Sequence, residues 1–225
     1  MIFQHILKLA MTISSKHFIS LCFLIMFLTV MQGQETWELV KEKQGIKVFT
    51  RQNEAKLFKE FKSIMQIKAE MSDFLAVLYD VEGLPKWAYN ITESRLLNRP
   101  DPYNQTYYAI AKAPWPYKNR DGVYHNKISW DEHQKVLTIE IGFLEDTVEI
   151  YENLVRMDGY GFWMAKEIGD GELEITFQMQ VDPGGAIKAW IANMFVSDSP
   201  YFTMKGLRDV MKEKEYQGHS YELLK

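Results

Sequence analysis

Hydrophobic and polar residues alternate strictly from residue 172 to residue 181. The apolar positions are Leu173, Ile175, Phe177, Met179 and Val181. Because successive side chains of a strand point to opposite faces, this pattern predicts a strand with one buried face. Asp182, Pro183, Gly184 and Gly185 follow and predict a sharp corner, since proline cannot continue a ladder and glycine adopts backbone angles that other residues resist.

The period of the pattern changes to that of a helix directly after this corner. Apolar side chains recur on one stripe at Ile187, Trp190, Ile191, Met194 and Phe195. Proline suits the first turn of a helix, so Pro200 predicts an interruption and a fresh start. A second stripe then follows at Met204, Leu207 and Met211. This C-terminal helix has to bury its stripe against residues further upstream.

Most of the upstream chain has the pattern of strands. Residues 37–40 predict a short helix, and Ser72 is placed to cap another that carries Phe74, Leu75 and Leu78. Strand patterns occupy residues 45–51, 57–67, 91–97, 103–111, 120–130, 136–141, 150–163 and 173–181. Short turns between consecutive strands imply an antiparallel sheet. We therefore expect an α+β fold in which this sheet packs on the C-terminal helix.

The first 33 residues predict a secretory signal peptide. Lys8 and Lys16 precede an uncharged apolar run from Phe18 to Met31, and this run is shorter than the ~20 residues of a membrane-spanning helix. We expect cleavage after Gly33, export to a periplasm or to the exterior, one domain over residues 34–218 and a short tail over residues 219–225. An uncleaved membrane anchor is the alternative.

Composition narrows the classes of function. The single cysteine, Cys22, lies in the expected signal, so the exported protein has no thiol for a disulfide, a metal or a nucleophile. The formal net charge is −4 and no Lys/Arg cluster stands out, which argues against a nucleic-acid partner. The chain is rich in large apolar residues, with 6 Trp, 12 Tyr, 13 Phe and 12 Met, which have to fill a dense core or line a cavity.

Three motifs occur in an order that resembles a known family. They are Gly45–Arg51 preceded by Trp37, the segment Pro114–Tyr124, and Asp182–Gly185 followed by a helix. Together with Trp87 and Trp163, they resemble the START family of lipid-transfer domains, especially its phosphatidylcholine-transfer-like branch. The resemblance implies a helix-grip fold: a curved antiparallel sheet wrapped around the long C-terminal helix, with a lipid-sized tunnel between them.

The resemblance also indicates where a ligand would bind. Sterol-binding members carry opposite charges on two adjacent strands, and this chain has the neutral Tyr107 and Asn126 at those positions, which argues against a sterol-type ligand and against a charged headgroup contact there. Small residues on the same inward parity, Ala109, Ala111 and Gly122, would leave space opposite a bulky helix. The candidate ligand-binding residues are Tyr107, Ala109, Tyr124, Asn126, Phe177, Trp190, Met194, Phe195 and Met204.

A second group of residues has a structural interpretation. Arg120 and Asp121 form either a contact to a ligand headgroup or a structural pair that anchors the proline-rich corner. Pro183, Gly184 and Gly185 shape the corner before the C-terminal helix. We expect no metal and no cofactor, because His125, His133 and His219 are scattered and no nucleophile motif surrounds a serine. Asn90 and Asn104 match glycosylation acceptors.

Three functions remain open from the sequence. The first is a non-catalytic, monomeric carrier, store or sensor of a lipid or other apolar molecule, with transient contact to a membrane surface. The second is a cyclase-like enzyme of the helix-grip superfamily, which would need an inward-facing titratable group. The third is an interaction module whose helical stripe packs as plain core. For a carrier, we expect the segment after Pro200 to undock more readily than residues 187–195.

Overall fold

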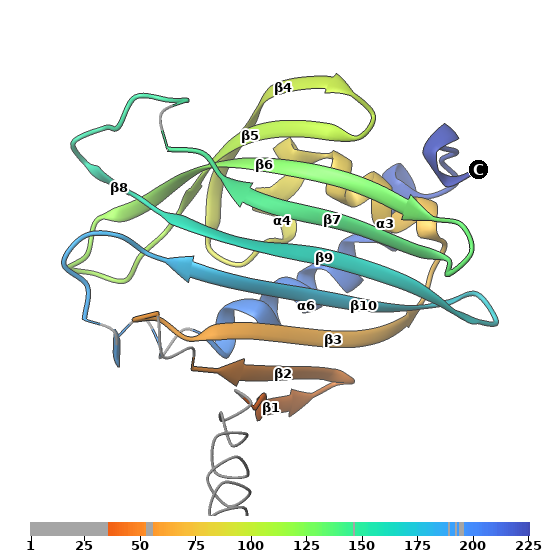
Figure 1. Cartoon of the computed structure of the whole chain (residues 1–225), viewed down its shortest axis with the longest axis horizontal. Coiled ribbons are helices and arrows are strands. Elements are labelled where there is room, and N and C mark those ends of the chain that lie inside the picture. Colours follow the sequence, from red (N-terminus) through yellow and green to blue (C-terminus); the bar gives the residue numbers. More distant parts are fainter. Residues whose placement is uncertain (1–35, 53–55, 146, 189, 192, 194–195) are drawn as a thin grey trace, which may run out of the picture. The chain divides into compact units, whose positions relative to one another are not determined.

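An antiparallel sheet forms most of the protein, with its helices packed on one face (Figure 1). The structure is a computed structural model, and it describes residues 36–52, 56–145, 147–188, 190–191, 193 and 196–225. The strands are β1 (Glu38–Lys43), β2 (Ile46–Arg51), β3 (Glu60–Lys68), β4 (Ile91–Asp101), β5 (Asn104–Ala111), β6 (Asn119–Asp131), β7 (Val136–Phe143), β8 (Leu154–Arg156), β9 (Asp158–Gly169) and β10 (Glu172–Asp182).

The spatial order of the strands is β1-β2-β3-β10-β9-β7-β6-β5-β4. All neighbours on this path are antiparallel, and β8 alone pairs with β6 in parallel. The helices are α3 (Met71–Tyr79), α4 (Leu84–Trp87) and α6 (Asp198–Val210). Helix α6 packs against β2, β3 and α4, so the C-terminal helix lies across the sheet as the sequence predicted. Among the described residues, no helix is both long enough and apolar enough to cross a membrane.

The predicted helix at residues 37–40 is wrong, because this segment belongs to strand β1. Gln44 and Gly45 both have positive φ, 53° and 76°, which is the geometry of a two-residue hairpin turn. The hairpin pairs β1 with β2, so the backbone of β1 finds its partners there. Leu39 is 48% exposed, which shows that this edge strand has no apolar face to bury as a helix would.

The strand predicted for residues 150–163 is two strands. Leu154–Arg156 forms β8 beside β6, and the chain then enters β9 at Asp158. The amide of Met157 donates to the carbonyl of Asp121 over 2.9 Å, which continues the contact to β6. A hydrophobicity pattern does not report such a change of strand partner.

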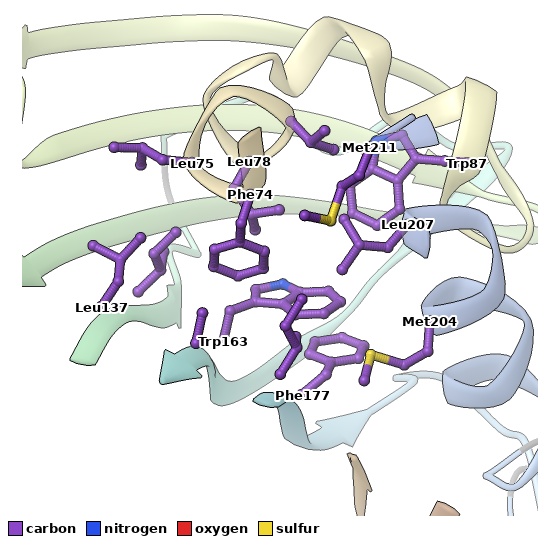
Figure 2. Packing of buried hydrophobic residues seen from close by; sticks show 14 of the residues in the cluster. Phe74, Leu75, Leu78, Trp87, Leu137, Trp163, Phe177, Met204, Leu207 and Met211 are labelled. Atoms are coloured by element: carbon purple, nitrogen blue, oxygen red, sulfur yellow. The ribbon is translucent and has the colours of Figure 1, made fainter. Parts of the chain in front are cut away.

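The core lies between the sheet and the helices (Figure 2). Trp163 on β9 and Phe177 on β10 are register partners, and their rings stack with centroids 3.9 Å apart. Phe74 of α3 meets the ring of Trp163 edge-on, while Met204 and Leu207 of α6 are fully buried above the sheet. The second predicted stripe, at Met204, Leu207 and Met211, therefore packs as core.

The first predicted stripe differs from the expectation at Trp190. Its side chain is 63% exposed, although Trp190 and Ile191 are helical. The described members of this stripe do not form one core face, because Ile187 and Ile191 are only partly buried while the fully buried Met204 and Leu207 of α6 cover the sheet. Met194 and Phe195 lie outside the described residues.

Helix α6 approaches α4 closely because of a glycine. A Cβ atom on Gly206 would lie 2.1 Å from the carbonyl oxygen of Trp87, which is far inside van der Waals contact. Only a residue without a side chain allows this spacing of the two backbones.

The predicted domain limits concern the two ends of the chain. Residues 1–33, the expected signal peptide, lie outside the described residues. The expected tail at residues 219–225 packs on the rest of the protein, since Leu223 is 7% exposed and belongs to the hydrophobic core. Residues from Trp37 to Lys225 form one compact unit.

Candidate ligand-binding cavity

A cavity of about 320 Å³ lies between the sheet and the C-terminal segment. Its lining comes from β3, α4, β4, β5, β6, β7, β9 and β10, from α6 and from the chain that leads into α6. Most of the lining is aromatic or aliphatic, and the aromatic members are Phe58, Phe61, Trp87, Tyr89, Tyr107, Tyr124, Phe143, Trp163 and Phe177. This volume is at the lower end of the ~300–1,000 Å³ that is typical of ligand pockets.

Two tyrosines from neighbouring strands form one wall of the cavity. Tyr107 of β5 and Tyr124 of β6 are register partners, and their rings stack with centroids 4.9 Å apart. Burial raises the pKa of both hydroxyls, so both stay protonated at physiological pH. Neither hydroxyl makes a hydrogen bond to another described residue, and each can therefore orient a ligand's polar group.

Small residues make the room for this tyrosine wall. Ala109 and Ala111 line the cavity, as their inward parity predicts. Gly122, the partner of Ala109, does not line it. A Cβ atom on Gly122 would lie 2.9 Å from the ring of Tyr124, so the space that this glycine leaves is occupied by that ring.

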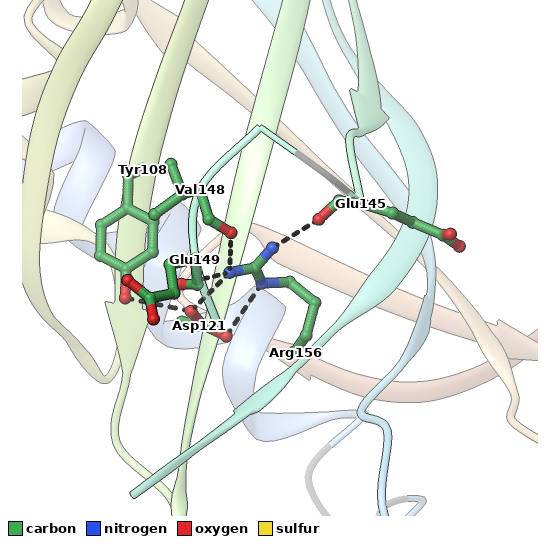
Figure 3. Close-up of polar contacts among 6 residues, drawn as sticks. All are labelled: Tyr108, Asp121, Glu145, Val148, Glu149 and Arg156. Carbon is green, nitrogen blue, oxygen red and sulfur yellow. Dashed lines mark hydrogen bonds and ion pairs between the residues drawn. The ribbon is translucent and has the colours of Figure 1, made fainter. Parts of the chain in front are cut away.

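Arg120 and Asp121 do not pair with each other, because adjacent residues of β6 point to opposite faces of the sheet. The carboxylate of Asp121 instead holds Arg156 of β8, with Nη2 to Oδ2 at 3.0 Å and Nε to Oδ1 at 3.1 Å (Figure 3). Tyr108 donates its hydroxyl to the same carboxylate over 3.1 Å, and burial raises the pKa of this tyrosine. The predicted structural pair therefore has Arg156, not Arg120, as its cation.

Arg156 also fixes the connection between β7 and β8. It donates to the carbonyl oxygens of Glu145 at 2.7 Å and Val148 at 3.1 Å (Figure 3). Asp121 is fully buried and the side chain of Arg156 is 10% exposed. This group is a structural anchor for an irregular segment of the chain.

Arg120 lines the cavity and is 6% exposed. Its Nε donates to the carbonyl oxygen of Pro183 over 3.3 Å, its Nη1 donates to the carbonyl oxygen of Lys118, and the ring of Tyr117 lies 5.8 Å from the guanidinium carbon. Burial lowers the pKa of Arg120 from its ordinary value, but an arginine stays charged at physiological pH.

The other predicted site residues that the structure describes divide into four groups. Phe177 and Pro183 line the cavity together with the residues described above. Asn126 and Met204 are buried but do not line it, and the Oδ1 atom of Asn126 has no described hydrogen-bond partner. Trp190 is exposed and also lies outside the lining. Gly184 and Gly185 form the corner, each with φ at 65°.

Sequence reasoning missed several lining residues. Lys59 and Lys112 line the cavity although each flanks a strand, and Phe143 packs on Tyr124 with centroids 4.5 Å apart. Lys59 lies in a predicted strand, but its charge argues against a place in an apolar cavity, and Lys112 lies in a connection whose path the alternation pattern leaves open. No group of three metal-ligating side chains occurs within the described residues.

An antiparallel sheet with a C-terminal helix packed across it and an apolar cavity beside that helix defines the helix-grip class of proteins. No protein-family model matches the chain. The chain is 32% identical over 183 residues to an uncharacterised protein of Pseudomonas aeruginosa, covering 80% of this chain and 89% of that protein.

One solved structure identifies the family, and a second shows the same fold. A STAR-related lipid transfer protein from Xanthomonas axonopodis is 32% identical, with a TM-score of 0.73 over 79% of this chain and 99% of that chain. Human STARD10 has the same fold at 21% identity, with a TM-score of 0.69 over 88% of this chain and 79% of that chain. The chain belongs to the START family.

Proposed function

We propose that this protein is a non-catalytic carrier that holds one apolar or amphipathic molecule in the cavity between the sheet and the C-terminal segment. The observation that supports the proposal is the aromatic and aliphatic lining, because burial of apolar area stabilises such a complex by about 25 cal/mol per Å² before entropic costs. The Xanthomonas relative is named as a lipid transfer protein, which agrees with this ligand class.

The alternative of a cyclase-like enzyme has less support. Catalysis by proton transfer would need an inward-facing group that titrates near neutral pH. Among the described lining residues, the titratable side chains are those of Lys59, Lys112, Arg120 and several tyrosines. The raised pKa values of Tyr107 and Tyr124 move these hydroxyls away from the range that an acid or base needs.

The proposal includes a route for the ligand from a membrane surface. Several large apolar side chains next to lining residues are exposed: Leu57 precedes Phe58, Trp115 follows Pro114, and Trp190 lies between Ile187 and Asn193. Trp115 is 92% exposed. Exposed aromatic side chains favour the membrane interface, where a carrier can take up or release its ligand.

Export through the N-terminal signal is also part of the proposal.

The test is native mass spectrometry of the mature protein after gentle purification, followed by incubation with phosphatidylcholine vesicles. We expect one bound amphiphile per chain, and the vesicles also test the phosphatidylcholine ligand that the resemblance implies. A protein that carries no molecule and takes none from vesicles of any composition would overturn the carrier function. The intact mass of the exported protein should correspond to a chain that begins near Gln34.

A further inference from the structure

The charged side chains that line the cavity are all cationic. They are Lys59, Lys112 and Arg120, and no aspartate or glutamate belongs to the described lining. The whole chain has a formal net charge of −4, so the positive charge of the cavity is opposite in sign to the net charge of the protein. A cavity with cations and no anions favours a ligand that brings the negative charge itself.

Arg120 is the most buried of these three cations, so its charge is the most costly to leave without a counter-charge. Only backbone carbonyl oxygens accept its hydrogen bonds, and no carboxylate among the described residues forms an ion pair with it. Asp121, its neighbour in sequence, is on the other face of β6 and is already bound to Arg156. A buried charge without a counter-charge is costly, and an anion at this position removes that cost.

Arg120 lies at a charged end of the cavity, and the rest of the cavity is mostly apolar. Arg120 is the register partner of Ala111, so it lies beside Lys112 where β5 ends. Tyr124 lies four residues further along β6, which corresponds to about 13 Å at the rise of a strand. Trp163 lies deeper still, since its partner Ile139 pairs with Ile128 of β6.

We propose that the ligand is a single-chain amphiphile with a carboxylate or phosphate monoester head, which binds Arg120 while its hydrocarbon chain runs past Tyr124 toward Trp163 and Phe177. The inference rests on the proposed carrier function and specifies its ligand. Guanidinium groups bind carboxylates and phosphates through paired hydrogen bonds, which Arg120 can offer to such a head. The cavity volume at the lower end of the usual range favours one hydrocarbon chain over two.

The experiment compares ligands that share one chain length and differ only in the head. Palmitate, hexadecyl phosphate, hexadecanol and hexadecyltrimethylammonium are titrated into the mature, delipidated protein by calorimetry below their critical micelle concentrations. We expect the two acids to bind about tenfold or more tightly than the alcohol, and the ammonium to bind most weakly. Inorganic phosphate at millimolar concentration should not displace palmitate, because it lacks the chain.

Substitutions then assign the preference to Arg120. Arg120→Gln and Arg120→Met both remove the charge, and the second retains an apolar side chain of similar length. Each should lose about tenfold in palmitate affinity and leave hexadecanol affinity unchanged. Lys166→Gln, on an exposed position of β9, is the control and should change neither. Arg120→Met should also unfold at a temperature no lower than the ligand-free wild type, because it buries no unpaired charge.

The outcomes separate this inference from the carrier function. Equal affinities for palmitate and hexadecanol in the wild type would overturn the anionic ligand and leave the carrier function intact. An equal loss of both ligands in a folded Arg120 variant would overturn the role of Arg120. Failure of all four amphiphiles, together with failure of vesicle uptake, would overturn the carrier function itself. The wild-type comparison decides the ligand class even where a variant does not fold.

Discussion

At the scale of single residues, the positions that decide this fold are not those with the strongest pattern. Trp190 belongs to a helical stripe and is exposed, whereas Gly206 has no pattern at all and sets the distance between α6 and α4. A residue affects stability through the atoms around it. Next to Gly206 lies the backbone carbonyl of Trp87, which cannot move easily to make room for a side chain.

The substitution Gly206→Ala tests this close approach. The added Cβ would meet the carbonyl oxygen of Trp87 at 2.1 Å, so we expect a loss of ~1–3 kcal/mol in unfolding free energy despite the better helix propensity of alanine. Chemical denaturation gives the value. Gly142→Ala is the matched control, because a Cβ there has no atom within 4 Å. A variant at position 206 as stable as the wild type would show that the two helices are not tightly packed.

At the scale of elements, an ion pair on the outer side of β6 holds an irregular segment in place. Asp121 binds Arg156, and Arg156 binds backbone carbonyls of the connection between β7 and β8. The parallel pairing of β8 with β6 brings these residues together, and one short strand therefore depends on one buried carboxylate.

Removal of that carboxylate should loosen the whole connection. Asp121→Asn keeps the shape of the side chain but removes the negative charge that Arg156 contacts, and we expect a loss of ~3–5 kcal/mol in unfolding free energy. Amide exchange at residues 147–153 should accelerate as well. Glu42→Gln removes an exposed ion pair with Lys47, 3.8 Å long, and should cost at most about 1 kcal/mol. Equal effects of the two substitutions would contradict the anchoring role of Asp121.

The sequence was sufficient for the elements that follow a local period. Alternation predicts β10 because its apolar face is buried, and the stripe of Met204, Leu207 and Met211 predicts α6. The sequence alone did not specify contacts that depend on strand partners: the hairpin β1–β2, the parallel strand β8 and the pairing of Asp121 with Arg156. For the cavity, the family resemblance indicated Tyr107 and parity then indicated Tyr124, while the position of Lys112 depends on the path of a loop.

At the scale of the whole molecule, a ligand can reach the cavity only if one part of its enclosure moves. The hydrogen-bonded backbone of the sheet does not open without breaking its ladder. Helix α6 is firmly attached: Met204 and Leu207 are fully buried, Tyr201 donates its hydroxyl to Gln44 Oε1 over 3.1 Å, and Arg208 donates to the carbonyl oxygen of Gln44 over 2.7 Å. These contacts argue against the expectation that the segment after Pro200 undocks first.

Between the corner and α6, the described residues make fewer contacts than those of α6. Trp190 is 63% exposed, while Ile187 and Val196 are only partly buried and line the cavity. One long-range hydrogen bond is described for this stretch, from the amide of Lys59 to Asn193 Oδ1 at 3.1 Å. A segment with little buried area and few hydrogen bonds opens at a lower free energy than the core. We therefore place the access route here.

Hydrogen exchange measured residue by residue tests this route. The amides of Ile187, Ile191 and Val196 should exchange faster than those of Met204 and Leu207, and bound palmitate should slow the first group more than the second. Asn193→Ala removes the hydrogen bond to Lys59 and should speed both opening and ligand uptake without lowering global stability by more than about 1 kcal/mol. Thr92→Ala, at an exposed hydrogen bond on β4, should change neither rate. Faster exchange in α6 than in the preceding segment would contradict this route. It would instead make α6 the moving part, because a ligand enters through the region that opens at the lowest free energy.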